Sequence, residues 1–209
     1  KLSKYITEIP AGAFEGCTAL KKVLYQDLTS IGERAFSGCT SLGKFTVANS
    51  VKSMGTKAFE GATEVVVNAK NADVAIAASS SGAKKLTINL PTDGLHDARL
   101  EISESTDDVT INGYKRTYKN IEILSNCART SINGIYFSDN TGVPLTVEGG
   151  TLTLTNVNVT NAKGYAFVLG QDPQKEYTKE YAPVNIILNG ISTVSTSGDI
   201  AILSRDLTL

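Results

Sequence analysis

The sequence is poor in the residues from which metal centres and dense disulfide frameworks are built. Its 209 residues include one histidine, His96, three cysteines and no tryptophan. A zinc site draws on several Cys and His ligands, and a disulfide scaffold needs more cysteines than three. No stretch of the chain approaches the ~20 apolar residues of a membrane span. We therefore expect no metal, no cofactor and no membrane-spanning segment in this chain.

A charge excess of either sign is also missing. The 20 Lys and Arg residues balance 21 Asp and Glu residues, for a formal charge of -1. Without a global basic field, the chain has no general attraction for phosphate backbones, and nucleic acid is excluded as a partner. Hydrophobic residues make up 41% and charged residues 20%, which is ordinary for a globular protein. Residues 1–10 show no signal-peptide pattern.

An internal repeat occupies the first third of the chain. Phe14, Phe36 and Phe59 follow each other at nearly equal spacing, each inside an Ala-Phe-x-Gly segment. Cys17 and Cys39 hold the same repeat position, and Ala62 takes their place in the third copy. A unit this short cannot bury its own apolar face, so the copies must stack, Phe upon Phe. We expect each Ala-Phe-x-Gly segment to form a helical turn that ends at glycine. The segment after it, from Leu20 in the first copy, should form the strand of the coil.

These motifs resemble the BspA-like class of leucine-rich repeats, whose pattern is close to I-x-x-I-G-x-x-A-F-x-G-C-x-x-L. The resemblance covers residues 5–68, and the pattern breaks after Ala62, where we expect the regular array to end. It implies a secreted or cell-surface protein, since such repeats occur mainly in bacteria of the gut and mouth and in some parasitic protists. Some members of the class are adhesins that bind host matrix proteins.

A second, weaker repeat is predicted in the C-terminal half. Leu124, Leu154 and Leu188 align as equivalent positions of three successive coils, and Cys127, Val157 and Ile191 then align in the same frame, as do Gly134, Gly164 and Gly198. Short β-rich runs at 145–147, 151–154 and 184–188 alternate with Asn and Gly corners at Asn156, Asn158, Asn161, Asn189 and Gly190. This half resembles the right-handed parallel β-helix domains of bacterial surface and polysaccharide-associated proteins.

The predicted fold is therefore mainly β, a solenoid. A short leucine-rich repeat array (1–68) is followed by an irregular coil or linker (69–99) and a right-handed parallel β-helix (100–209). The strand expected at 86–90 favours one continuous stack. Because the sequence starts and stops inside repeats, we expect it to be a piece of a larger protein.

The predicted core contains the residues at equivalent repeat positions: Phe14, Cys17, Phe36, Cys39, Phe59, Cys127, Val157 and Ile191. Stacked coils would place Cys17 and Cys39 ~5 Å apart, within reach of a disulfide. The alternative, which Ala62 favours, is that both are buried thiols that act as small hydrophobic side chains.

No catalytic site is predicted. His96 lies in a turn-like segment beside Asp93 and Asp97, where a solvated loop histidine is the simpler interpretation. Asp107 and Asp108 are adjacent, so in a strand their carboxylates point to opposite faces. A polysaccharide lyase or hydrolase would draw on Asp139, Asp172, Asp199, Arg129 and Arg205, and no spacing brings these together.

Two surfaces are candidates for binding. If Leu20, Val23 and Tyr25 point inward, then Lys22 and Leu24 point outward, with Lys44 and Thr46 as their counterparts one coil on. The insertion 171–183 carries Tyr177 and Tyr181, which could form an aromatic platform for a sugar or a protein, or pack on the solenoid wall as part of a solvated loop.

The function predicted from the sequence is non-catalytic adhesion or protein interaction by a monomeric, secreted or cell-surface protein of a host-associated bacterium. Host matrix proteins or glycans are the expected partners. A carbohydrate-binding β-helix module, a polysaccharide-active enzyme and a purely structural spacer stay open as alternatives.

Overall fold

Parallel strands dominate the computed structural model, which describes residues 5–92, 95–170, 184–189, 193–196, 202–204 and 207–208. The chain divides into two compact units. Unit 1 comprises Lys1–Pro91 and Ser103–Asp107, and unit 2 comprises Thr92–Ile102 and Asp108–Leu209. In both units successive coils stack through parallel strand pairs. The predicted mainly β solenoid fold is confirmed.

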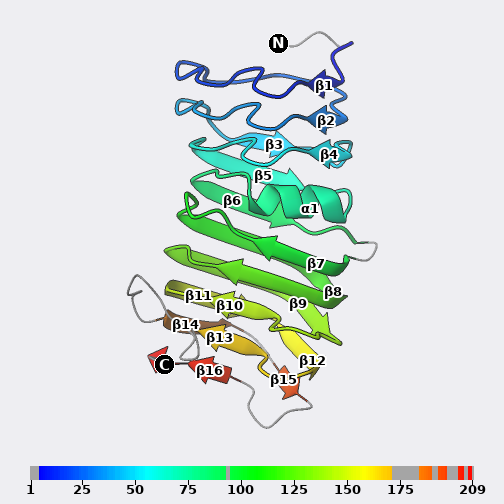
Figure 1. Cartoon of the computed structure of the whole chain (residues 1–209), viewed down its shortest axis with the longest axis vertical. Helices are drawn as coiled ribbons and strands as arrows, with labels where there is room; N and C mark the ends of the chain where they lie inside the picture. The colour runs from blue at the N-terminus through cyan, green and yellow to red at the C-terminus, as the bar shows by residue number, and fades with distance from the viewer. Residues whose placement is uncertain are drawn as a thin grey trace. The chain divides into compact units, whose positions relative to one another are not determined.

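Unit 1 contains two parallel sheets, both visible in Figure 1. One is built from the two-residue strands β1 (Glu8–Ile9), β2 (Ser30–Ile31) and β4 (Ser53–Met54). The other contains β3 (Phe45–Val47), β5 (Glu64–Asn68) and β6 (Lys85–Asn89). The helix α1 (Ala72–Ser79) follows β5, and the Asn71 side chain caps it by accepting a hydrogen bond from the backbone N–H of Val74 at 2.9 Å.

The Ala-Phe-x-Gly segments form stacked turns that end at left-handed glycines, as the repeat predicts. Gly16, Gly38 and Gly61 have φ of 71°, 77° and 80°, a backbone conformation that glycine adopts without a Cβ penalty. The backbone N–H of Phe14 donates to Ala35 O, and that of Phe36 donates to Ala58 O, both at 2.8 Å. The ring of Phe36 stacks between those of Phe14 and Phe59, with centroids 5.2 Å apart on each side.

One expectation for unit 1 needs correction. Residues 20–25 do not form a strand, although Val23 and Tyr25 are less exposed than Lys22 and Leu24, as the expected alternation requires. The strand expected at 86–90 is confirmed as β6, so stacking within unit 1 continues beyond the point where the sequence pattern breaks. The N–H of Gly61 donates to Gly82 O at 3.0 Å, and β6 pairs with β5 along its whole length. Stacking continues because strand pairing needs backbone groups and inward aliphatic side chains rather than the full motif.

Unit 2 is a parallel β-helix with three strand faces. One face contains β7 (His96–Glu101), the end of β8 (Asp108–Ser125), β10 (Leu145–Val147), β13 (Phe167–Leu169) and β16 (Ile202–Ser204). The second contains the start of β8, β9 (Arg129–Ser138), β11 (Gly150–Thr155), β14 (Val184–Asn189) and β17 (Leu207–Thr208). The third contains the middle of β8 and the end of β9, with β12 (Asn158–Ala162) and β15 (Thr193–Thr196).

The strand β8 turns a corner within its 18 residues. Tyr114 and Lys115 both have positive φ, 54° and 58°, and the neighbouring strand β9 turns at Gly134 with φ of 61°. A Cβ on Gly134 would lie 2.8 Å from the backbone nitrogen of Lys115, so the two corners pack backbone against backbone. Glycine at this corner therefore serves both the left-handed conformation and the close approach.

The predicted repeat length of the β-helix was wrong for its first interval. Leu124 pairs with Thr146 and not with Leu154, which itself pairs with Ile132. The interval in sequence between equivalent positions of neighbouring coils is therefore shorter there than predicted. The second interval is confirmed, because Leu154 pairs with Leu188 in β14. The strands expected at 145–147, 151–154 and 184–188 are confirmed, and Asn156 forms a left-handed corner. Asn158 and Asn161 instead lie within β12.

The predicted core residues differ in burial. Phe36, Cys39, Phe59, Cys127 and Val157 are buried with at most 1% of their surface exposed, and Phe14 is half-buried. Cys17, expected in the core, is exposed. The coil that carries Cys17 has a described neighbouring coil on one side only, so nothing in the described chain covers its other side. Both Cys17 and Cys39 are free thiols. Ile191 lies outside the described residues.

Candidate interaction surface

The outward face of β3, β5 and β6 in unit 1 presents side chains in rows across the strands. Side chains of a strand alternate between its two faces, so residues two apart share a face. Phe45 and Val47 are buried, whereas Lys44 and Thr46 are exposed. In the preceding coil Lys22 and Leu24 are exposed in the same way. The structure thus brings the four residues Lys22, Leu24, Lys44 and Thr46 to one face, which we call the outward face.

The middle of the outward face is a row of aliphatic and threonine side chains. Thr46 pairs with Val66, and Val66 pairs with Thr87. Leu24 precedes Thr46 by one repeat, and its side chain is 46% exposed. Because neighbouring strands lie ~4.8 Å apart, Thr46, Val66 and Thr87 form a continuous line of methyl and hydroxyl groups. We call Leu24, Thr46, Val66 and Thr87 the central row.

A shallow hollow of about 170 Å³ opens beside Leu24. Its lining residues are Lys22, Val23, Leu24, Tyr25, Leu42, Lys44, Phe45 and Thr46. The Tyr25 ring forms one side of it by stacking on Phe45 with centroids 5.4 Å apart, and the Tyr25 hydroxyl donates a hydrogen bond to Thr46 O. Burial of the phenol raises the pKa of Tyr25 above its ordinary value. The hollow is therefore a partly aromatic recess next to an exposed leucine, with two lysines, Lys22 and Lys44, in its lining.

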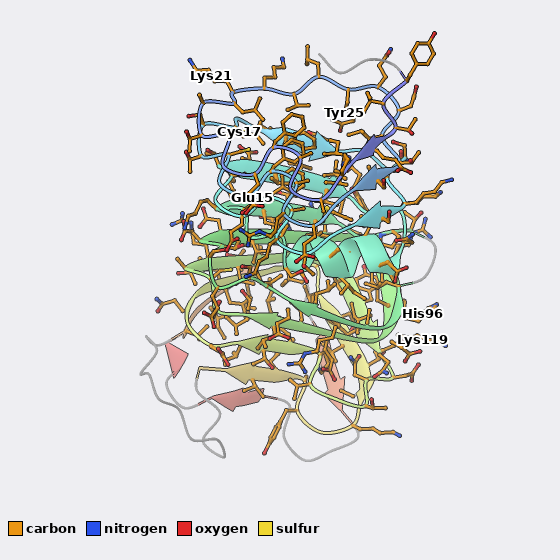
Figure 2. All side chains as sticks on the ribbon, turned by 45° about the horizontal axis from the view of Figure 1, so that its top comes forward. Glu15, Cys17, Lys21, Tyr25, His96 and Lys119 are labelled. Atoms are coloured by element: carbon orange, nitrogen blue, oxygen red, sulfur yellow. The ribbon has the colours of Figure 1, made fainter. Side chains whose placement is uncertain are left out.

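Lysines gather along one edge of the outward face. Lys44 forms an ion pair with Glu64 at 3.2 Å, and Glu64 pairs in the sheet with Lys85. Lys84, next to Lys85, lies 3.8 Å from the carboxylate of Asp107 and donates to Ser105 O. Lys21, next to Lys22, lies at the outer edge of the first coil (Figure 2). Sequence reasoning found Lys22 and Lys44 but missed Lys84 and Lys85, because the motif used for alignment ends at Ala62.

The opposite edge of the outward face is closed by an asparagine pair. The side-chain amide of Asn89 donates to the side-chain oxygen of Asn68 at 2.7 Å, and the two residues are paired between β5 and β6. Stacked asparagines of this kind hold neighbouring coils in register. The outward face therefore has a basic edge, an apolar middle and a neutral polar edge.

A second hollow, of about 520 Å³, lies at a corner of unit 2 and contains His96, Asp97, Lys119, Asn120, Asp139 and Thr141. His96 pairs with Lys119 between β7 and β8, and the two side chains lie side by side in Figure 2. A hydrogen bond holds the Asp97 carboxylate at the corner: the side-chain amide of Asn120 donates to it at 2.7 Å. The structure thus brings His96, Asp97 and Asp139 to one hollow, together with a lysine. Asp93 lies outside the described residues.

The remaining sequence-predicted polar residues do not form a reactive group in the described chain. Arg129 is paired with the carboxylate of Asp108 at 2.6 Å, and Asp107 faces Lys84. Asp172, Asp199, Arg205, Tyr177 and Tyr181 lie outside the described residues. Within the described ranges, no three His, Cys, Asp or Glu side chains are grouped so that they could hold a metal ion. No helix in the same ranges has the length and apolar character to cross a membrane.

Comparison with protein families places the first part of the chain among known repeats. Residues 1–73 match the model of the BspA type leucine rich repeat region, in six copies. The resemblance predicted from the motifs of residues 5–68 is thereby confirmed. No curated protein and no solved structure matches the chain.

Proposed function

We propose that this protein is a non-catalytic extracellular repeat protein that binds another protein through the outward face of β3, β5 and β6. The observation that carries this proposal is the central row, in which the exposed Leu24 leads into Thr46, Val66 and Thr87 on consecutive strands. Solenoids use such extended, rigid sheet faces as binding surfaces. An exposed leucine beside an aromatic recess suits a partner that supplies its own apolar side chain.

Adhesion at a cell surface is the setting that the repeats favour. Residues 1–73 match the BspA type leucine rich repeat region, and this resemblance implies a secreted or surface protein of a host-associated bacterium, with host matrix proteins as expected partners. We propose the same setting for this chain, acting as a monomer. Several weak contacts spread along a rigid surface would then add up to firm attachment.

Catalysis is not proposed for the hollow around His96, because several of its polar side chains are hydrogen-bonded to one another at the corner. It holds the chain's one histidine, but the neighbouring Asp97 carboxylate accepts a hydrogen bond from Asn120 and serves the corner. The hydroxyl of Thr141, which also lines the hollow, donates to the side-chain oxygen of Asn120 at 2.9 Å. The carbohydrate-binding alternative through Tyr177 and Tyr181 stays a prediction.

The test is a binding array that carries matrix proteins and polysaccharides side by side, probed with the labelled 209-residue protein. We expect saturable binding to one or more matrix proteins. Leu24→Glu should weaken that binding at least about tenfold, because a charge would enter an apolar contact. The matched control is Ile76→Glu, which makes the same kind of change at an isoleucine of α1 that is 39% exposed. The control should bind like the parent.

Two results would overturn the proposal. If Leu24→Glu and Ile76→Glu both bind like the parent, the outward face is not the binding surface. If binding is confined to polysaccharides and falls with Tyr177→Ala or Tyr181→Ala, the function belongs to the β-helix and its insertion.

A further inference from the structure

The basic edge of the outward face carries more charge than the structure itself neutralises. Where the chain enters the strands of this face, unit 1 has five lysines, Lys21, Lys22, Lys44, Lys84 and Lys85, and two carboxylates, Glu64 and Asp107. This leaves an excess of three positive charges on a chain whose formal net charge is -1. Positive charge therefore exceeds negative charge locally along this edge.

Both carboxylates already have partners. Glu64 is paired with Lys44 and Asp107 with Lys84. Lys21, Lys22 and Lys85 are exposed, and within the described residues none of them has a carboxylate within 4.0 Å. Three ammonium groups on this edge are thus free to meet an external anion.

The free lysines lie in line with the strands, next to the central row. Glu64 and Lys85 are opposite each other in the sheet, Lys44 contacts Glu64, and Lys22 precedes Lys44 by one repeat. At ~4.8 Å per strand, Lys22 and Lys85 are separated by ~14 Å, which four or five extended residues span. The central row is two residues further along each strand, or ~7 Å away.

We propose that the outward face binds an acidic, extended polypeptide segment that crosses the strands, with carboxylates on Lys21, Lys22 and Lys85 and aliphatic side chains on the central row, one at Leu24 and one at Val66. This inference rests on the proposed function, whose partner class it names. Charge complementarity selects an acidic partner. The adjacent row of methyl groups favours a polypeptide over a sulfated polysaccharide, which has no apolar side chain to place there.

The probes are an eight-residue synthetic peptide of alternating glutamate and valine, the same peptide with glutamine in place of glutamate, and a heparin oligosaccharide. Binding to the 209-residue protein is followed by fluorescence anisotropy at low and at high salt. We expect the glutamate peptide to bind at least about tenfold more tightly than the glutamine peptide, and salt to reduce this difference.

The decisive variant carries Lys21→Glu, Lys22→Glu and Lys85→Glu together. Its control carries Lys52→Glu, Lys70→Glu and Lys163→Glu, three exposed lysines that are not part of the outward face, so that both variants have the same net charge. The first should bind the glutamate peptide at least about tenfold more weakly than the parent, and the control should bind within about twofold of it. Circular dichroism should show both variants folded like the parent.

Three outcomes would overturn the inference: no binding of the glutamate peptide, equal losses in both triple variants, or heparin binding that needs the three lysines while the peptide does not bind. The proposed function can hold even if this inference fails. Suppose that Leu24→Glu abolishes binding of a matrix protein, while the variant with Lys21→Glu, Lys22→Glu and Lys85→Glu binds it like the parent. The outward face is then the binding surface, and only the inference that its partner is acidic is wrong.

Discussion

Tyr118 is the residue whose burial has the clearest chemical consequence. Its ring is 1% exposed inside unit 2, and its hydroxyl donates a hydrogen bond to Gly113 O at 3.0 Å. Burial disfavours the phenolate and raises the pKa of Tyr118 to about 12. A folded-state pKa above the unfolded value of ~10 means that the neutral phenol stabilises the fold.

The pH dependence follows from the direction of this shift. The contribution of Tyr118 to the free energy of unfolding is fully present below pH 10 and is lost as the pH rises from 10 towards 12. We predict that Tyr118→Phe lowers stability by ~1 kcal/mol at pH 8, because it removes a buried hydrogen bond. The deficit should shrink above pH 10, since the variant has no phenol to ionise.

Urea unfolding of parent and variant at pH 8, 9, 10 and 11 measures this prediction. Comparing the two proteins at each pH cancels the contributions of the other tyrosines. A difference in the free energy of unfolding that stays constant from pH 8 to pH 11 would contradict it.

Cysteine exposure shows why a repeat position alone does not determine burial. Cys39 is enclosed, its thiol donates to Phe14 O at 3.1 Å, and burial raises the pKa of the thiol. Cys17 holds the same position in the repeat and is exposed. The residue type was predictable from the motif, but the burial depends on how many coils cover it.

At the scale of the element, the close approach of successive coils limits what can follow the inward residue at the end of β2 and β4, Ile31 and Met54. A Cβ on Gly32 would lie 2.3 Å from the backbone nitrogen of Ala11, and one on Gly55 would lie 2.2 Å from that of Glu33. Both contacts are with backbone, which cannot move aside without separating the coils. Glycine at this place in the motif is therefore a packing requirement between β1, β2 and β4.

We predict that Gly32→Ala or Gly55→Ala destabilises unit 1 by about 1–3 kcal/mol, the usual cost of overpacking a well-filled site. The matched control is Gly43→Ala, where the added Cβ would lie 3.6 Å from Lys21 O in ordinary contact and the backbone φ is not in the left-handed region. Urea denaturation followed by circular dichroism measures the effect. Equal stability of Gly32→Ala and Gly43→Ala would show that the coils can separate without cost.

Sheet register also depends on several elements together. The strands of the β-helix are visible in the sequence as short runs rich in β-branched residues, and β10, β11 and β14 confirm them. The sequence did not predict which strand positions pair with each other, because many inward positions carry interchangeable aliphatic residues. Leu124 could have matched several such positions, and the structure places it opposite Thr146.

At the scale of the whole molecule, the chain leaves unit 1 and returns to it. Residues 92–102 belong to unit 2, whereas Ser103–Asp107 belong to unit 1. There the backbone N–H of Ser103 donates to Ser79 O at 3.0 Å, and that of Asp107 donates to Lys84 O at 2.9 Å. A cut near residue 95, between the halves predicted from the sequence, would remove these contacts from unit 1.

We predict that a fragment of residues 1–107 unfolds at a higher temperature than a fragment of residues 1–95. The longer fragment keeps the hydrogen bonds from Ser103 and Asp107 and the ion pair of Lys84 with Asp107. Calorimetry or thermal circular dichroism on the two fragments gives the comparison. The same unfolding temperature for both would mean that residues 103–107 contribute nothing to the stability of unit 1.

The sequence by itself determined the solenoid class, the short repeat of the first third and its stacked phenylalanines. It could do so because glycine at a left-handed turn is a local requirement, and because a phenylalanine repeated at a fixed spacing can stack on its own copies in the neighbouring coils. It also placed Lys22, Leu24, Lys44 and Thr46 on one face, since strand alternation is a local property.

Only the tertiary structure decided what depends on neighbouring coils. The stacking of β6 under β5 adds Lys84 and Lys85 to the basic edge, and the pairing of Lys44 with Glu64 separates engaged lysines from free ones. The register of the β-helix and the exposure of Cys17 were decided in the same way. These properties arise between segments about 20 residues apart, where a residue's own identity does not specify which side chain lies beside it.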